Sequence, residues 1–257
     1  MNTITMQHIP EIAITPLNEN TISIEFGDTL ATPTPEIAQF ISTFRTALLA
    51  QLSASHPSLV KDHVTSYRSL ILYYDFLQLR ANTLKHIIET CWHTFIRSPN
   101  PLNEQGTNNK IIEVPVYYSE ETGPDLHIIA DTHKISIDTL IQKHTEKTYR
   151  IYAMGFAPGF AYMGFVAPEL RTPRLATPRA QVAKGSVGIA GAQTGVYPKE
   201  SPGGWNIIGR CPTDLIDLTH PIQTCCLFSV GDRIKFNAID QKTFVSLGGT
   251  LTQGAGK

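Results

Sequence analysis

The sequence predicts two domains: a small α+β domain, followed by a mainly β domain that folds as a barrel or a sandwich. In the first hundred residues, short strand-like segments are interspersed with two amphipathic helices. Beyond a polar stretch, many short β-like segments are separated by glycine- and proline-rich turns. The chain has 257 residues, of which 42% are hydrophobic and 17% charged. A globular protein of this size can bury a core in each of two domains.

The first domain is expected over residues 1–98. Its helices begin at Pro35 and near Asn82, where apolar side chains start to recur at helical spacing. Its strands are expected at residues 12–17, 21–26, 61–65 and 69–74. The order β-β-α-β-β-α predicts an antiparallel sheet backed by two helices.

Residues 99–109 are polar and carry two prolines and a glycine, which predicts a linker. The second domain is expected over residues 110–257. It should contain one short helix that starts at Pro124 and Asp125 and another that Ser136 caps. Its strands are expected at residues 111–118, 149–156, 187–192, 205–208, 214–218 and 233–239. So many short strands with Gly/Pro connections favour a barrel or sandwich over a parallel sheet.

Composition excludes several classes of function. The net charge of −1 gives no long-range attraction to nucleic acid or to a membrane. No stretch approaches the ~20 apolar residues that a membrane span needs, and the first residues do not resemble a secretion signal. The four cysteines lack CxxC spacing and the histidines are scattered, so no metal site is indicated. Four free thiols are typical of a reducing compartment, which predicts a cytoplasmic protein.

Residues 155–209 are the most informative segment, because they hold ten of the 18 glycines and six of the 17 prolines. Such a concentration beside aromatic and basic side chains predicts a loop-rich surface of fixed shape, and such surfaces usually bind a ligand. Up to Arg210 the segment carries a surplus of four positive charges. It contains no run of consecutive basic residues, so the expected ligand is a small anion and not a polymer.

Four aromatic residues of this segment are candidates for ligand contact. The turn at Pro158–Gly159 would present Phe160 and Tyr162, although both rings could equally belong to the core at a bulged strand end. Tyr197 and Trp205 follow glycine-rich stretches. Trp205 is either a core residue or a stacking wall for a ligand.

Five polar residues complete the candidate set. Prolines stiffen the segment that holds Arg174 and Arg179, and a guanidinium group matches carboxylate or phosphate oxygens. Gln193 and Thr194 lie between glycines, and Arg210 lies just past an apolar strand. The alternatives are a solvated basic loop and a tightly packed barrel corner. No P-loop and no nucleophile elbow is present, so no catalytic residue is assigned.

Several long motifs resemble a known family. They include SYRSLILYYD, GFAPGFAYMGF, RLATPR, GSVGIAGAQTGVYPKESPGGWNIIGR and VGDRIKF. In this order they are similar to the family of the B subunit of bacterial 5-oxoprolinase, which also contains the kinase inhibitor KipI and the protein labelled allophanate hydrolase subunit 1. The resemblance covers nearly the whole chain. Ala183 and Ala192 depart from the usual proline and glycine, and neither change removes a polar group.

The resemblance implies that the second domain is a cyclophilin-like β-barrel. It also implies a direct partner, the barrel-containing C subunit of 5-oxoprolinase, and a separate A subunit. Together the three would open 5-oxoproline to L-glutamate with ATP and its Mg²⁺. The carboxyltransferase domain of urea carboxylase suggests that two such barrels shape one pocket. Because the chain has no nucleotide motif, ATP is expected at a partner or composite site, and the chain is expected to be a non-autonomous part of an enzyme.

Two other functions remain open on the sequence alone. A KipI-like protein would inhibit a sensor histidine kinase by direct binding and would need an apolar surface but no anion pocket. A prolyl isomerase would follow only from the shape of the barrel, which does not determine function.

Overall fold

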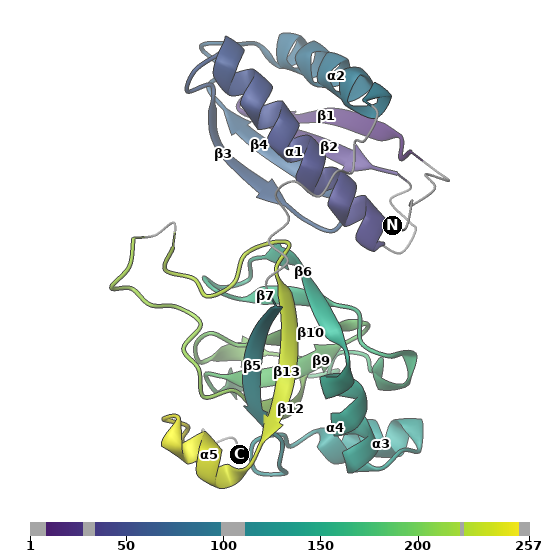
Figure 1. Cartoon of the computed structure of the whole chain (residues 1–257), viewed down its shortest axis with the longest axis vertical. Coiled ribbons are helices and arrows are strands. Elements are labelled where there is room, and N and C mark those ends of the chain that lie inside the picture. The colour runs from purple at the N-terminus through teal and green to yellow at the C-terminus, as the bar shows by residue number, and fades with distance from the viewer. Residues whose placement is uncertain (1–8, 28–33, 99–110, 222–223, 252–257) are drawn as a thin grey trace. The chain divides into compact units, whose positions relative to one another are not determined.

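The computed structural model describes residues 9–27, 34–98, 111–221 and 224–251. The chain forms two compact units, residues 1–107 and 108–257 (Figure 1). The linker predicted at residues 99–109 lies outside the described residues, so the domain boundaries at 98 and 110 stay a prediction. Each unit is described by itself.

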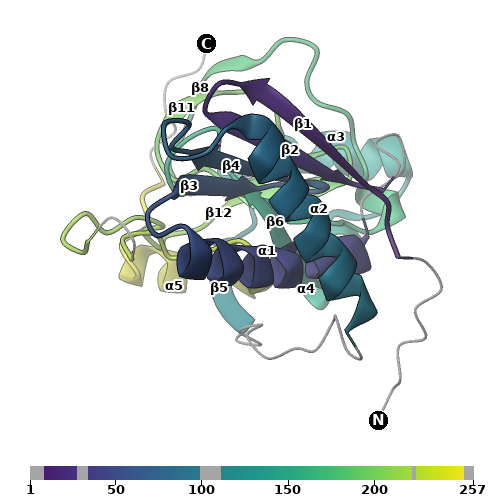
Figure 2. The same ribbon diagram turned by 90° about the horizontal axis from the view of Figure 1, so that it is seen from above.

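The first unit is an antiparallel sheet covered on one face by two helices (Figure 2). The strands pair in the order β1-β2-β4-β3. Their bounds are Ile12–Asn18 for β1, Thr21–Phe26 for β2, Val60–Thr65 for β3 and Ser69–Tyr74 for β4. The helices are α1, Pro35–Ser55, and α2, Ala81–Arg97. This confirms the α+β architecture that the sequence predicts.

The core of the first unit follows from strand alternation. Ile22, Ile24 and Phe26 project from one face of β2 and are fully buried. The ring of Phe26 packs edge-on against Phe44 of α1 and Trp92 of α2, with centroids 5.9 and 5.7 Å away. Aromatic side chains from three elements therefore join the sheet to both helices.

The second unit is a closed barrel in which the strands neighbour one another in the order β10-β7-β6-β13-β5-β12-β9, and β9 pairs with β10. Among the strand pairs that the structure describes, only β5–β13 is parallel. The strands are β5 Ile111–Tyr117, β6 Thr148–Met154, β7 Ala161–Gly164, β9 Ser186–Ala190, β10 Gln193–Val196, β12 Asn206–Arg210 and β13 Arg233–Ile239. Closure leaves no free edge in this sheet and confirms the barrel.

Short helices and one ribbon lie outside the barrel sheet. Helix α3, Leu126–His133, and helix α4, Ile137–Glu146, lie where the sequence places them. As expected, the Ser136 hydroxyl caps α4, accepting a hydrogen bond from the Thr139 amide at 3.1 Å. The remaining elements are the β8–β11 ribbon, Arg179–Val182 with Ser201–Gly203, a 3₁₀ turn at Pro168–Leu170 and helix α5, Gln241–Ser246.

The strand predicted at residues 214–218 is wrong. This segment belongs to an irregular excursion between β12 and β13 and makes only an isolated bridge from Ile216 to Cys226. Leu215 packs in the barrel core, but Leu218 is exposed, so the apolar residues of the segment do not share one buried face. Conversely, β7, β8, β10 and β11 were not predicted, since each has only three or four residues.

Candidate anion-binding site

The nine predicted site residues fall into separate places in the second unit. Arg179 and Arg210 line one cleft. Phe160, Tyr162, Tyr197 and Trp205 form an aromatic cluster. Burial raises the pKa of the Tyr197 hydroxyl, and the charge of the nearby, exposed Arg174 opposes this shift. Gln193 and Thr194 lie on β10.

The cleft has a volume of about 290 Å³. Ligand pockets for drug-sized molecules begin near ~300 Å³, so this one suits a small metabolite. Its walls come from the turn after β5, from β8 and the residue after it, and from β9 and β12. They comprise Glu121, Thr122, Pro124, Arg179, Gln181, Val182, Ala183, Ser186, Ile207 and Arg210.

Arg210 is the unusual residue of this cleft, because only 8% of its surface is exposed. Its Nη1 donates to the Thr250 carbonyl at 2.9 Å, whereas its buried Nε has no hydrogen-bond partner among the described residues. Nor does any described carboxylate form an ion pair with it. Burial lowers the pKa of Arg210, and the charge of Glu121 opposes this shift. A buried cation without a carboxylate partner is costly unless an anion joins it.

Ser186 lies beside Arg210, since the two residues are partners in the β9–β12 register. Only 2% of Ser186 is exposed, and its hydroxyl forms no hydrogen bond with another described residue. Two adjacent strands therefore bring a guanidinium and a free hydroxyl, both of them donors, to one side of the cleft.

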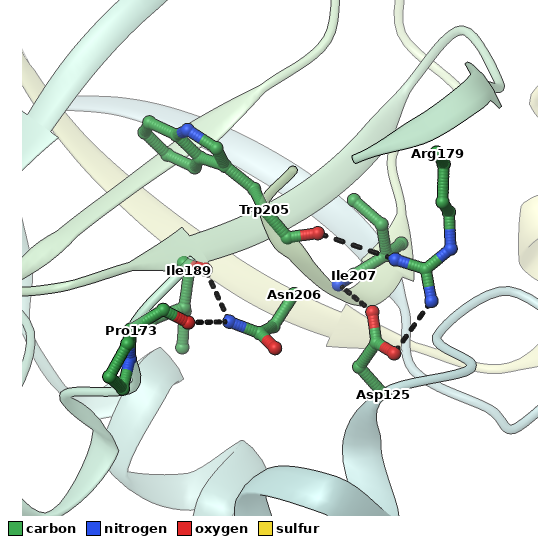
Figure 3. Close-up of polar contacts among 7 residues, drawn as sticks. All are labelled: Asp125, Pro173, Arg179, Ile189, Trp205, Asn206 and Ile207. Atoms are coloured by element: carbon green, nitrogen blue, oxygen red, sulfur yellow. Dashed lines mark hydrogen bonds and ion pairs between the residues drawn. The ribbon is translucent and has the colours of Figure 1, made fainter. Parts of the chain in front are cut away.

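Arg179 is held differently, through an ion pair with Asp125 (Figure 3). Asp125 is fully buried. Its Oδ1 accepts from Nη2 of Arg179 at 2.7 Å, and its Oδ2 accepts from the Ile207 amide at 2.6 Å. The charge of Arg179 is thus largely neutralised within the protein. Arg179 shapes the wall of the cleft, and Arg210 supplies the unpaired cation.

A second set of polar contacts fixes the proline-rich segment that precedes β8. Asn206 donates from Nδ2 to the carbonyls of Pro173, at 2.8 Å, and Ile189, at 3.2 Å (Figure 3). The Leu175 amide donates to the Gly204 carbonyl at 2.8 Å. The segment is therefore bound to the barrel along its length, as the expectation of a fixed shape requires.

Sequence reasoning missed Asp125 and Asn206 as site-forming residues. Asp125 follows a proline before a helix and reads as an N-cap, but its side chain does not cap α3. Its partners lie 54 and 82 positions further along the chain. No local pattern signals such distant pairs.

The aromatic cluster is mainly a packing unit. Phe160 is buried, and its ring centroid lies 4.9 Å from Tyr162 and 5.4 Å from both Tyr197 and Trp205. Trp205 is 4% exposed, which favours the core alternative over the stacking wall in this chain. Phe156 was missed: it is 61% exposed, has a left-handed φ of 70° and packs against Phe160.

Thr194 lies in the barrel core and not at the cleft. Its hydroxyl donates to the Gly188 carbonyl at 3.0 Å and lies 2.9 Å from Nε2 of His144. Since the hydroxyl proton is used, Nε2 carries the imidazole proton and donates it to Thr194. Nδ1 of His144 then accepts from the Tyr118 hydroxyl at 2.8 Å. Burial lowers the pKa of His144 to about 3, which agrees with a neutral ring.

The described part of the chain contains no group of three or more His, Cys, Asp or Glu side chains that could hold a metal ion. Among the described helices, none has the length and apolar composition to span a membrane.

The fold and the sequence place the chain in a family of carboxyltransferase-type proteins. The model of the carboxyltransferase domain, subdomain C and D, matches residues 12–227, and the chain belongs to this family. More narrowly, it is 35% identical over 189 residues to the 5-oxoprolinase B subunit of Bacillus subtilis (strain 168), covering 70% of this chain and 76% of that protein. The B subunit of Haemophilus influenzae is 47% identical over 125 residues, 49% of this chain and 58% of that protein.

Solved structures agree with this assignment. The crystal structure of TTHA0988 matches 86% of this chain with a TM-score of 0.68 and 31% identity, and the chain spans 40% of its length. The urea amidolyase of K. lactis matches 92% of the chain with a TM-score of 0.70, and the chain spans 15% of its length. At 17% identity this second likeness concerns the fold alone.

Proposed function

We propose that the chain is the B subunit of an ATP-dependent 5-oxoprolinase in the cytoplasm, where it acts with the A and C subunits to open 5-oxoproline to L-glutamate. The names of the curated relatives support this function and not the KipI-like alternative. The observation that carries it is the buried Arg210, which forms no ion pair with a described residue and lines a cleft of small-metabolite size. The substrate is a small acid, and this cleft offers a cation to it.

The chemistry supports a division of labour within the complex. The amide nitrogen of a lactam is a poor leaving group, so phosphorylation of the amide oxygen would make the ring carbon electrophilic. This chain contributes donors and a shaped wall, which stabilise charge. ATP and Mg²⁺ are proposed to bind on a partner or at a composite site, because the described residues offer no metal-ligand cluster.

Reconstitution tests this function. The chain is mixed with the purified A and C subunits, and ADP and glutamate are measured with and without 5-oxoproline. We expect substrate-dependent release of both products from the complete set, and only background release when this chain is omitted. The same rates without the chain would contradict the proposal. A pull-down that retrieves a histidine kinase and neither of these partners would point to the inhibitor function instead.

A further inference from the structure

We propose that Arg210 and Ser186 form the subsite for the carboxylate of the substrate, and that the Thr250 carbonyl holds the guanidinium at Nη1 and leaves the edge formed by Nε and Nη2 to the ligand. The identity of the acid rests on the proposed function. The binding of a small carboxylic acid rests only on the geometry of the cleft.

The guanidinium group of Arg210 has more N–H donors than it has acceptors among the described residues. A guanidinium group carries five N–H donors, and one edge, formed by Nε and Nη2, can hold both oxygens of a carboxylate. In Arg210 only Nη1 has a partner among the described residues, the Thr250 carbonyl. A buried donor that is left unsatisfied destabilises the protein, so an acceptor at Nε is favoured. A carboxylate would supply the missing acceptor, and the Ser186 hydroxyl would donate to the same group.

The charged side chains that line the cleft also favour a small acid. Arg179 is paired with Asp125, so it does not compete for the ligand. Glu121 is the only acid among the residues that line the cleft, and it is exposed and forms no ion pair with a described residue. Its carboxylate is an acceptor suited to the lactam N–H. One cation and one acceptor then match the two polar ends of a cyclic amino acid.

The Thr250 carbonyl reaches Arg210 after a turn that follows helix α5. Gly248 adopts a left-handed φ of 89°, and the Gly249 amide donates to the Phe244 carbonyl at 2.9 Å. Phe244 packs against Tyr117 with the rings tilted by 31° and their centroids 5.4 Å apart, which anchors the turn to β5. A neutral carbonyl is a weaker partner for a guanidinium than a carboxylate. The contact at Nη1 therefore orients the guanidinium without neutralising its charge, and a carboxylate at the edge formed by Nε and Nη2 would be the stronger partner.

Direct binding to the full-length chain, measured by isothermal titration calorimetry, tests the subsite. The probes are 5-oxoproline, pyrrolidin-2-one (the same ring without the carboxylate), inorganic phosphate and Mg-ATP. We expect 5-oxoproline to bind at least tenfold more tightly than pyrrolidin-2-one. Arg210→Lys should weaken 5-oxoproline at least tenfold and pyrrolidin-2-one hardly at all. The matched control is Arg233→Ala, on the exposed side of β13.

The results separate the two proposals. Equal affinity for the two ring compounds, or Arg210-dependent binding of phosphate or Mg-ATP in preference to 5-oxoproline, overturns the carboxylate subsite. Absence of 5-oxoproline binding, both to the chain and to its mixture with the A and C subunits, also overturns it. Arg210-dependent binding without any ADP release by the reconstituted set would keep the subsite and reject the proposed function. Normal ADP release by the three subunits reconstituted with the Arg210→Lys variant would keep the proposed function and reject the subsite. Circular dichroism and thermal unfolding confirm that each variant is folded.

Discussion

Replacing Arg179 by alanine should destabilise the second unit by about 3 kcal/mol. The change leaves the fully buried Asp125 carboxylate with one hydrogen bond, from the Ile207 amide. Removing one partner of a buried ion pair costs about 3–5 kcal/mol. The lower end applies here, because the Arg179 side chain is 32% exposed and water can enter the space that it leaves.

The decisive comparison adds Asp125→Asn to Arg179→Ala. The asparagine oxygen can still accept from the Ile207 amide, and no charge remains to be solvated. The double variant should therefore be more stable than Arg179→Ala alone, with a coupling of about 2 kcal/mol. Lys184→Ala serves as the control, since its ion pair with Asp214 is more than half exposed and should contribute at most ~1 kcal/mol.

Urea denaturation followed by tryptophan fluorescence measures these free energies of unfolding, and hydrogen exchange at the Ile207 amide assigns the change to the second unit. The reasoning is refuted if Asp125→Asn fails to rescue Arg179→Ala. It is equally refuted if Lys184→Ala costs as much as Arg179→Ala. Either result would mean that the pair does not hold β12 in place.

Three further predictions use the same unfolding assay. Burial lowers the pKa of His144 from 6.5 to about 3, so the unfolded chain binds more protons than the folded chain between these pH values. The free energy of unfolding should therefore fall as the pH is lowered from 6.5 towards 3. His144→Gln should make the free energy of unfolding less dependent on pH in this range. Gly203→Ala should be destabilising because a Cβ would overlap the Tyr197 ring, whereas the neighbouring Gly204→Ala meets only ordinary contacts and should be tolerated. Ser136→Ala should lower the free energy of unfolding by about 1 kcal/mol, because it removes the side-chain cap of α4. An unchanged free energy of unfolding would show that the cap does not contribute to stability.

Local periodicity accounts for the part of the fold that could be predicted. The long helices and most of the longer strands have enough residues for a hydrophobic face to show, as in α1 and β2. The strands that were missed have three or four residues each, too few to establish alternation. In the false strand at residues 214–218, Leu215 packs in the barrel core while Leu218 is exposed, so the segment has no continuous buried face.

In the candidate site, too, local sequence pattern predicted individual residues but not their distant partners. Arg210 was predicted because a charge follows an apolar strand, and Arg179 because prolines stiffen its segment. The sequence could not indicate that Arg179 forms an ion pair with Asp125, whereas no described carboxylate pairs with Arg210. That difference depends on contacts 54 residues apart for one arginine and on a carbonyl 40 residues away for the other.

The parallel pairing of β5 with β13 has a consequence for biosynthesis. β5 is made first, yet one of its neighbours is the last strand of the barrel. Until residue 239 has left the ribosome, β5 and β6 both lack this partner and expose unpaired backbone groups. The first unit has no such dependence and can fold while the remainder is still being translated. Slow emergence of β13 would therefore lengthen the period in which the nascent barrel is open to aggregation.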